Sequence, residues 1–215
     1  RKRLQLVQQS TQHILSVQGL YVRHLNKRLA SNKIKQLTVE QLAMDFTDLN
    51  VRLAVKGNIT VQRCLREQIH EIEKSLKQQL KLKEAFVQLT SIDGIGLILA
   101  LTIMLETGDI SRFSKVGQYA SYCRCVNGAR YSNGKKKGKS NTKNGNKYLA
   151  WAFIEAANFA IRFNGTVKKY YQRKRAKTHM MVAKKAVAHK LARACFYVLR
   201  DQVEFDVNKA FGYST

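Results

Sequence analysis

The 215-residue chain contains no proline. At the usual frequency of about 5%, roughly ten prolines would be expected. Proline is the strongest interrupter of a helix, because its ring removes a backbone donor and clashes with the preceding turn. The chain is also 45% apolar, which is enough to build a core. These features predict an all-α protein of one or two domains with little or no sheet.

Two runs of residues repeat at alternating spacings of three and four. The first is Leu4, Val7, Thr11, Ile14, Gln18, Tyr21 and Leu25, and the second is Val61, Leu65, Ile69, Ile72, Leu76 and Leu80. This spacing is typical of coiled-coil seams. Residues 1–88 are therefore predicted to form a helical coiled-coil region. The sequence leaves open whether it is an antiparallel hairpin packed on itself or an arm that forms a homo-oligomer.

Boundary signals divide this first region. The first helix is expected to end near Ser31-Asn32. Thr38 and Gln41 have the spacing of a capping box, which predicts a second helix running to about Ala54. Gly57-Asn58 is then expected to turn the chain into the second long helix.

The composition changes around Ser91, where an apolar helix end is followed by Gly94-Ile-Gly96 and another apolar run. This order is typical of a helix-hairpin-helix. In that motif glycines permit a tight turn, and backbone N–H groups at the helix start bind a DNA phosphate. Gly94 and Gly96 are thus candidate DNA-binding residues of a second helical domain, residues 89–215. The alternative is an ordinary turn between helices with a buried loop.

Positive charge is concentrated in this second domain. Between Arg112 and Arg200 there are 22 Lys or Arg residues and one acid, Glu155. A polyanion would relieve the self-repulsion of such a surface, so nucleic acid is the predicted partner; a solvated basic face is the alternative. The candidate DNA-binding side chains lie in a basic Gly/Asn loop, at the start of the next helix and in a basic segment further on. They are Arg130, Lys135, Lys136, Lys137, Lys139, Lys143, Lys147, Arg173, Lys174 and Arg175.

Other classes of protein are disfavoured. No stretch of about 18 uncharged apolar residues is present, and the initial Arg-Lys-Arg precedes no signal-peptide core, so a soluble intracellular protein without a membrane partner is expected. The four cysteines are too few and too scattered for a disulfide framework or a zinc site. They are expected to be buried thiols, and no metal or other cofactor is predicted within this chain. The four are Cys64, Cys123, Cys125 and Cys195.

Five short motifs follow one another in the second domain. They are Gly94-Ile-Gly-Leu-Ile-Leu-Ala100, Glu106-Thr-Gly-Asp-Ile-Ser-Arg-Phe113, Tyr119-Ala-Ser-Tyr-Cys123, Ser132-Asn-Gly-Lys-Lys-Lys-Gly138 and Lys143-Asn-Gly-Asn-Lys-Tyr-Leu-Ala-Trp-Ala152. Their order resembles the C-terminal transposase domain of the insertion-sequence 110/116/902 family over about residues 90–213. An ordered run of motifs is more specific than any one of them. Residues 1–88 resemble the central coiled coil of that family more loosely.

The resemblance implies a DNA recombinase of a bacterial mobile element, located at the nucleoid, with a serine nucleophile. In the better understood members an element-encoded guide RNA is a further partner. The family's serine falls on Ser132, with Ser121 and Ser140 as rivals. Its attack on a phosphodiester would store the bond energy in a phosphoseryl link, and nearby lysines would neutralise the developing charge. The alternatives are a turn serine and a non-catalytic helix-hairpin-helix module that binds nucleic acid.

Full-length relatives begin with a nuclease-like fold whose acidic residues bind magnesium, and the present chain starts at the basic helix that would follow it. Asp93, Glu106 and Asp109 are interpreted as turn and cap residues. The resemblance therefore implies Mg²⁺ only together with that missing fold. It also implies that the chain is a truncated remnant or one part of an enzyme completed by another polypeptide, and the chain is not expected to act alone.

Overall fold

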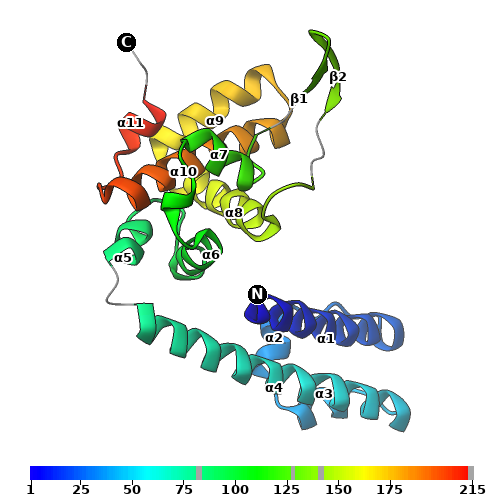
Figure 1. Ribbon diagram of the computed structural model, residues 1–215. Helices are drawn as coiled ribbons and strands as arrows, with labels where there is room; N and C mark the ends of the chain where they lie inside the picture. The colour runs from blue at the N-terminus through cyan, green and yellow to red at the C-terminus, as the bar shows by residue number, and fades with distance from the viewer. Residues whose placement is uncertain (81–83, 127–128, 140–142, 213–215) are drawn as a thin grey trace. The chain divides into compact units, whose positions relative to one another are not determined.

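The computed structural model describes residues 1–80, 84–126, 129–139 and 143–212 (Figure 1). Helices are the main regular structure of these residues and the other is a single two-stranded sheet, which confirms the predicted all-α class. The chain divides into two compact units, residues 1–79 and residues 80–215. Nowhere in the described ranges is a helix both long and apolar enough to cross a membrane.

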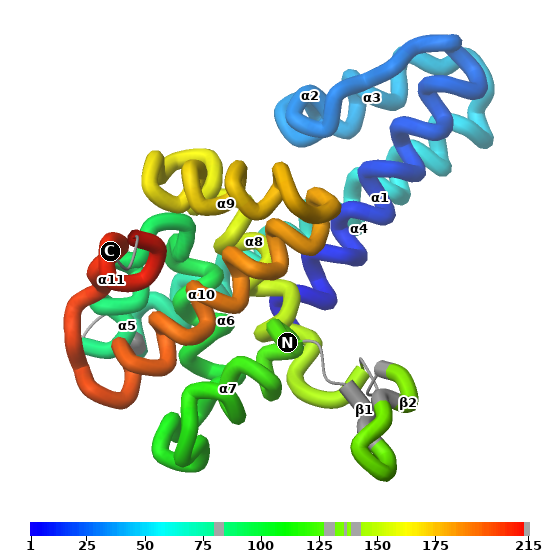
Figure 2. Tube along the Cα trace, turned by 90° about the horizontal axis from the view of Figure 1, so that it is seen from above, coloured from blue at the N-terminus to red at the C-terminus, as the bar shows by residue number. Residues whose placement is uncertain are grey.

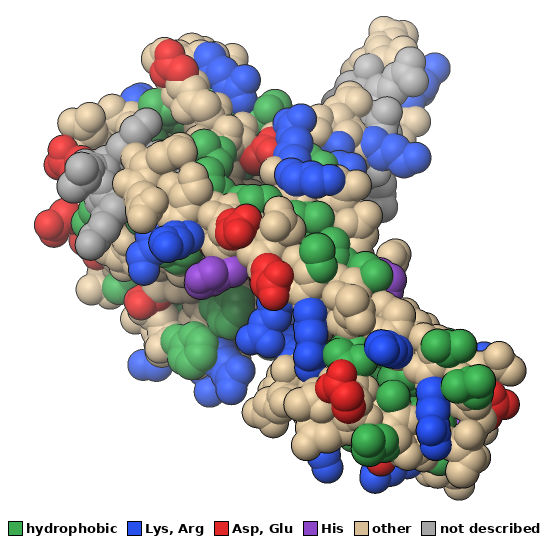
Figure 3. All heavy atoms as spheres, turned by 90° about the horizontal axis from the view of Figure 1, so that it is seen from below, with side chains coloured by type: hydrophobic (Ala, Val, Ile, Leu, Met, Phe, Trp, Pro, Cys, Tyr) green, Lys and Arg blue, Asp and Glu red, His purple; other side chains and the backbone are tan. Residues whose placement is uncertain are grey.

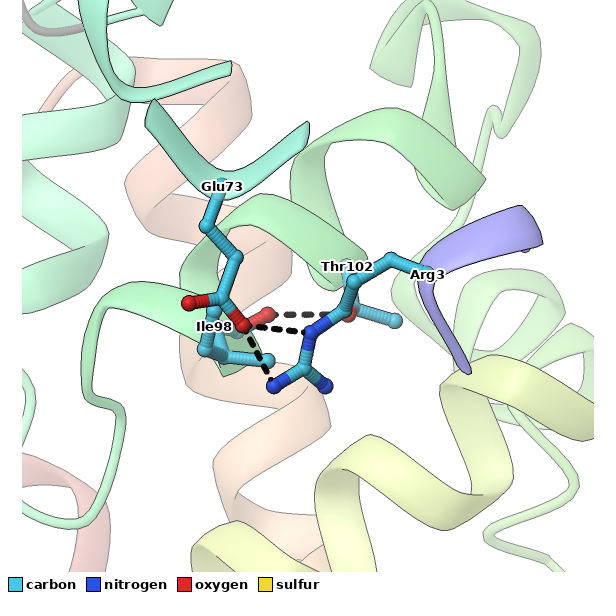
Figure 4. Close-up of polar contacts among 4 residues, drawn as sticks. All are labelled: Arg3, Glu73, Ile98 and Thr102. Atoms are coloured by element: carbon cyan, nitrogen blue, oxygen red, sulfur yellow. Dashed lines mark hydrogen bonds and ion pairs between the residues drawn. The ribbon is translucent and has the colours of Figure 1, made fainter. Parts of the chain in front are cut away.

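Two long helices form the frame of the first unit. These are α1 (Lys2–Leu25) and α4 (Leu49–Leu80), and the short helices α2 (Ser31–Gln36) and α3 (Val39–Met44) connect them. Near the start of α1, Arg3 Nε donates to Glu73 Oε1 at 2.7 Å (Figure 4). Further along α1, His13 Nδ1 lies 3.0 Å from Asn58 Oδ1. The later residue of α1, His13, contacts the earlier residue of α4, Asn58, and the earlier residue of α1, Arg3, contacts the later residue Glu73. The two helices are therefore antiparallel.

The core of this unit lies between α1, the two short helices and the first half of α4. Its buried side chains are Ile14, Val17, Leu20, Tyr21, Leu29, Ile34, Leu42, Phe46, Val51, Val55 and Ile59. The buried hydroxyl of Tyr21 has hydrogen-bond partners. It donates to Asp45 Oδ2 at 2.6 Å and lies 3.1 Å from the carbonyl oxygen of Leu42. Burial, followed by the bond to Asp45 and its charge, raises the pKa of Tyr21, so this phenol stays neutral.

The helix boundaries of the first unit differ in part from the prediction. The first helix ends at Leu25, where Asn26 adopts φ 47°, and Ser31 starts α2 instead of ending α1. Asparagine tolerates this left-handed conformation and so can stop a helix. The capping box is confirmed, since Gln41 N donates to Thr38 Oγ1 at 3.1 Å and Thr38 N to Gln41 Oε1 at 2.8 Å. The helix that it starts ends at Met44, however, well short of Ala54.

The turn expected at Gly57-Asn58 is wrong, because both residues lie inside α4. The Asn58 side chain donates to the carbonyl of Ala54 at 2.7 Å, and Val55 and Ile59 on either side are buried. A glycine costs a helix only about 1 kcal/mol relative to alanine. Burial of two apolar side chains stabilises by more than that amount, so tertiary packing decides the conformation. Of the predicted second seam, Val61 is 44% exposed, whereas Leu65, Ile69, Ile72 and Leu76 are half-buried.

The second unit contains a helical bundle around α10 (Met180–Asp201), which contacts α5, α7, α8, α9 and α11 (Figure 2). The other elements, in chain order, are α5 (Glu84–Thr90), α6 (Leu97–Thr107), the 3-10 helix η1 (Ile110–Arg112), α7 (Val116–Tyr122), β1 (Ala129–Ser132), β2 (Lys135–Lys139), α8 (Lys147–Phe163), α9 (Gly165–Lys177) and α11 (Val207–Phe211). Alanines make up four of the six buried residues of α8 and three of the eight buried residues of α10. They are Ala152, Ala156, Ala157, Ala160, Ala183, Ala188 and Ala192. Small side chains let these helices approach each other closely.

The cysteines follow the prediction with one exception. Cys123, Cys125 and Cys195 are buried free thiols, and burial raises the pKa of Cys125 to about 12. A thiol with so high a pKa stays protonated and unreactive at neutral pH. Cys64, expected to be buried, is exposed because it lies on the outer face of α4.

Candidate nucleic-acid interface

The basic Gly/Asn segment, expected to be a loop, contains an antiparallel hairpin. Strands β1 and β2 pair with Ser132 opposite Lys135, and Asn133-Gly134 connects them with φ values of 52° and 71°. Two successive positive φ angles are those of a type I′ turn, whose twist matches that of a hairpin. The sequence reasoning missed this element, although Asn-Gly between two short runs is the strongest local signal for it.

The hairpin contains a β-bulge. Tyr131 pairs with Lys136 and Arg130 with Gly138, which leaves Lys137 as the extra residue of β2. Gly138 has φ 134°, a conformation that glycine adopts without strain. A bulge increases the local twist and changes the direction of side chains. The bulge therefore sets where the exposed Lys137 points relative to the rest of the strand.

Ser132 is exposed and closes the turn together with Lys135, which is also exposed. Side chains of directly opposite residues lie on the same face of a sheet, with Cβ atoms about 4.5–5.5 Å apart. The hairpin thus presents one hydroxyl and one ammonium group on the same side of its tip. In Figures 1 and 2 this hairpin extends outward from the helices.

Several predicted residues lie near the hairpin but not on its tip. Lys143 is in the connection to α8, Lys147 is the first residue of α8, and the rival nucleophile Ser121 is exposed on α7. The other rival, Ser140, lies outside the described residues. Three predicted side chains on the strands are also outside them, those of Arg130, Lys136 and Lys139.

A polar cluster joins three of the motifs just beside the hairpin. Asn146 Nδ2 donates to Glu106 Oε2 at 2.7 Å and lies 3.3 Å from the Tyr122 hydroxyl. Its Oδ1 accepts from the N–H groups of Tyr148 at 2.8 Å and Leu149 at 3.1 Å, which caps α8. One buried asparagine therefore ties the ends of α6, α7 and α8 together. Sequence reasoning did not single it out, because its partners are 24 and 40 residues away.

Arg112 extends this cluster. Its guanidinium lies 4.7 Å from the centroid of the Tyr122 ring and 4.5 Å from that of Phe113. The hydrogen bond with Asn146 first, and then that with Arg112, lower the pKa of Tyr122. These cation–π contacts and hydrogen bonds fix the side chains at the C-terminal end of α7, which precedes the segment that contains the hairpin.

The return of the chain from the hairpin is anchored on the same helix end. The Arg124 guanidinium donates to the carbonyls of Gly145, at 3.1 Å from Nε, and of Lys143. Gly145 has φ 93°, and a Cβ atom there would lie 2.5 Å from the carbonyl oxygen of Tyr122. Glycine is required at this close approach. The hairpin segment therefore leaves and rejoins the bundle at one point.

The predicted helix-hairpin-helix corresponds to α5, the connection 91–96 and α6. Gly94, with φ 91°, packs against α8, so part of the connection is buried as the alternative interpretation expected. Gly96 is exposed and is the N-cap residue just before α6, where no side chain caps the helix. The first N–H groups of a helix have no partner inside it. Gly94 is thus a packing residue, whereas Gly96 stands at an uncapped helix start suited to a phosphate.

The third predicted group, Arg173, Lys174 and Arg175, is exposed on the last turns of α9. Burial, and then repulsion from Arg193, Lys174 and Arg173, lower the pKa of Lys190 on α10. The cations of α9 and α10 therefore lie close enough to repel one another. On the face drawn in Figure 3, lysine and arginine side chains are spread widely, with acidic ones between them.

Of the three carboxylates predicted to be turn and cap residues, Asp109 caps η1 and Asp93 lies in a turn, whereas Glu106 lies inside α6 and accepts from Asn146. Asp109 accepts from Ser111 N at 2.9 Å and from Ser111 Oγ at 2.7 Å, and Asp93 accepts from Asn164 Nδ2 at 2.6 Å. Across the part of the chain that the structure describes, no group of three or more His, Cys, Asp or Glu side chains could hold a metal ion.

Residues 87–172 match the family model described as Transposase IS116/IS110/IS902 family. The matched range runs from α5 into α9 and includes the hairpin and the cluster around Asn146. No curated protein shows a significant match to the chain.

Proposed function

Because residues 87–172 form a transposase domain of the IS116/IS110/IS902 family, we propose that this chain acts in DNA transposition and that Ser132 is the nucleophile. The supporting observation is the exposed pair of Ser132 and Lys135 on one side of the hairpin tip. An exposed tip is accessible to a DNA backbone, and the adjacent ammonium group attracts a phosphate.

In the proposed reaction, Ser132 Oγ attacks the phosphorus of a phosphodiester and loses its proton to solvent. The bond from phosphorus to one deoxyribose oxygen breaks, and that oxygen takes up a proton. The phosphoseryl ester keeps the bond energy, so a second DNA hydroxyl can reverse the step and join new ends. Lys135 and Lys137 would neutralise charge on the non-bridging oxygens.

The start of α6 is proposed to hold a neighbouring phosphate through backbone N–H groups. Replacing Leu97, the first residue of α6, by proline removes one of these N–H groups, while proline suits this helix position and the extended Gly96 before it (φ −79°, ψ 177°). We expect Leu97→Pro to bind duplex DNA about tenfold more weakly in a fluorescence-anisotropy titration, the effect of one charge-assisted hydrogen bond.

Leu97→Ala is the matched control, because it also removes the half-buried side chain but keeps the N–H group. It should bind DNA like the parent chain. Equal affinities for the proline and alanine variants would show that this amide does not contact DNA.

The cations of α9 are proposed to contact the DNA backbone. Each phosphate that a side chain neutralises contributes about −0.9 to the slope of log K against log salt concentration. The variant Arg173→Gln/Lys174→Gln/Arg175→Gln is expected to make that slope shallower by about 2 to 3 and to weaken binding to all duplex sequences alike.

The matched control removes the same number of exposed charges from the first unit by Lys27→Gln/Lys33→Gln/Lys35→Gln. It should change the slope by less than one. Equal slopes for the two triple variants would instead show that net charge, and not α9, sets the affinity.

A non-catalytic nucleic-acid-binding module is the second candidate function. In favour of it, the strands that flank the turn, Ala129–Ser132 and Lys135–Lys139, contain neither a histidine nor a carboxylate that could act as a base for Ser132. This function predicts salt-sensitive and sequence-tolerant binding without any covalent adduct. A guide RNA, and a homo-oligomer formed through residues 1–88, stay predictions.

A further inference from the structure

Two phenylalanines on α8 lie unusually exposed. Phe159 is 45% exposed and Phe163 is 66% exposed. Their rings are parallel, with centroids 6.3 Å apart and an angle of 6° between the planes. Residues four apart on a helix share a face, so the rings form one apolar platform. Most large aromatic side chains are well buried, so two adjacent exposed rings mark a surface that binds something.

The platform lies beside the helix-hairpin-helix connection. A Cβ atom at Gly94 would touch Ala156 and Ala160, so that face of α8 holds the connection. At 100° per residue, Phe163 is only about 20° from Ala156 around the helix. The next residue, Asn164, donates to Asp93 in the connection at 2.6 Å. Phe163 therefore lies beside the connection that leads to α6 in the same unit.

Charge at the Phe163 end is mixed, because Asp93, bonded to Asn164, is acidic whereas Arg162 and the nearby α9 are basic, so a phosphate is expected on the Arg162 side. The Arg162 guanidinium lies 5.3 Å from the centroid of the Phe163 ring, and α9, with its exposed cations, begins two residues later. At the other end, Glu155 lies one turn before Phe159 and would repel a phosphate. A nucleic-acid strand is thus expected to place its phosphates near Arg162 and its base on the rings.

We propose that Phe159 and Phe163 form a stacking platform for an unpaired nucleobase of the DNA strand. The inference rests on the proposed DNA binding and adds a preference for single-stranded DNA at this place. Parallel exposed rings next to a cation suit a nucleobase, because every base has a flat aromatic face and carries an anionic phosphate. Strand exchange in transposition generates such unpaired bases.

The test compares single-stranded and duplex DNA of about 12 nucleotides, both labelled with one 2-aminopurine, bound to the full chain. We expect Phe163→Ala to lower the affinity for the single strand by about 5- to 100-fold, the range for loss of one stacked base. The 2-aminopurine quenching on binding should disappear as well. Duplex affinity should change less than twofold.

Two further variants separate stacking from apolar contact. Phe163→Trp keeps an aromatic face and should retain parent affinity, whereas Phe163→Leu keeps an apolar side chain and should behave like the alanine variant. Leu105→Ala is a control for the loss of an apolar side chain elsewhere in the unit, because Leu105 is 55% exposed on α6. It should leave both affinities unchanged.

The remaining outcomes distinguish failure of the stacking platform from failure of the proposed function. Unchanged single-strand affinity in Phe163→Ala, with normal salt-sensitive duplex binding, overturns the platform but leaves the proposed function standing. A change in particle mass in sedimentation for Phe163→Ala shows that a second copy covers the rings, which also overturns it. Failure of the parent chain to bind any DNA refutes the proposed function itself.

Discussion

In a transposition-competent enzyme that carries this domain, Ser132→Ala is expected to abolish the covalent protein–DNA adduct. The loss of strand cleavage should be at least about 10⁴-fold, because removal of a covalent nucleophile leaves only the contribution of binding and charge stabilisation. DNA affinity should stay within about twofold, since the exposed hydroxyl contributes little to binding compared with the surrounding lysines. Adduct formation on a labelled DNA substrate, followed on denaturing gels, measures the first effect, and anisotropy measures the second.

Ser121→Ala is the matched control, because Ser121 is also exposed and lies on α7 beside the anchored ends of the hairpin segment. It should retain the adduct. If Ser132→Ala still formed the adduct and Ser121→Ala did not, the nucleophile would be on α7. If both variants and Ser140→Ala retained it, the serine mechanism would be wrong for this chain.

Gly94→Ala is expected to destabilise the second unit by about 3 kcal/mol or more. A Cβ atom at Gly94 would lie 2.4 Å from the carbonyl oxygen of Ala156 and 2.6 Å from the amide nitrogen of Ala160. Both are backbone atoms of α8 and cannot move aside as a flexible side chain would. The residue also has φ 91°, where an L side chain is strained. Overpacking and a strained backbone each cost about 1–3 kcal/mol.

Thermal unfolding should show the effect as a fall in Tm of about 10 °C, because 1 kcal/mol corresponds to about 2–4 °C in a protein of this size. Gly117→Ala is the control, since Gly117 lies in α7 with nothing within 4 Å of its added Cβ atom. That variant should be neutral or about 0.5–1 kcal/mol more stable, as expected for glycine in a helix. A Gly94→Ala protein as stable as the parent would show that the close packing of the connection on α8 does not exist in solution.

Signals confined to a few neighbouring residues predicted local structure well. The capping box of Thr38 and Gln41 is present because its two hydrogen bonds join residues three apart. The Asn133-Gly134 turn is equally local, but the density of lysines around it favours a flexible loop when the sequence is taken alone. The turn predicted at Gly57-Asn58 is wrong for the opposite reason. Contacts between α4 and α1 hold these residues in a helix, although the local sequence favours a turn.

The candidate site was predictable only in part. The sequence could single out Ser132 with its lysines because they are adjacent in the chain, and Gly94 with Gly96 because their spacing is short, and the roles of these residues stay predictions. The two glycines nevertheless have different environments, one against α8 and one open to solvent. Only three-dimensional neighbours distinguish them.

The sequence by itself determined the helical class and the excess of positive charge, because the absence of proline and a count of charges need no knowledge of contacts. Tertiary structure alone decided that Asn146 joins Glu106 and Tyr122, that Gly94 meets α8, and that Phe159 and Phe163 remain exposed. Each of these depends on which helix faces cover one another. Apolar periodicity marks a face to be buried, but burial itself depends on segments that are distant in the chain.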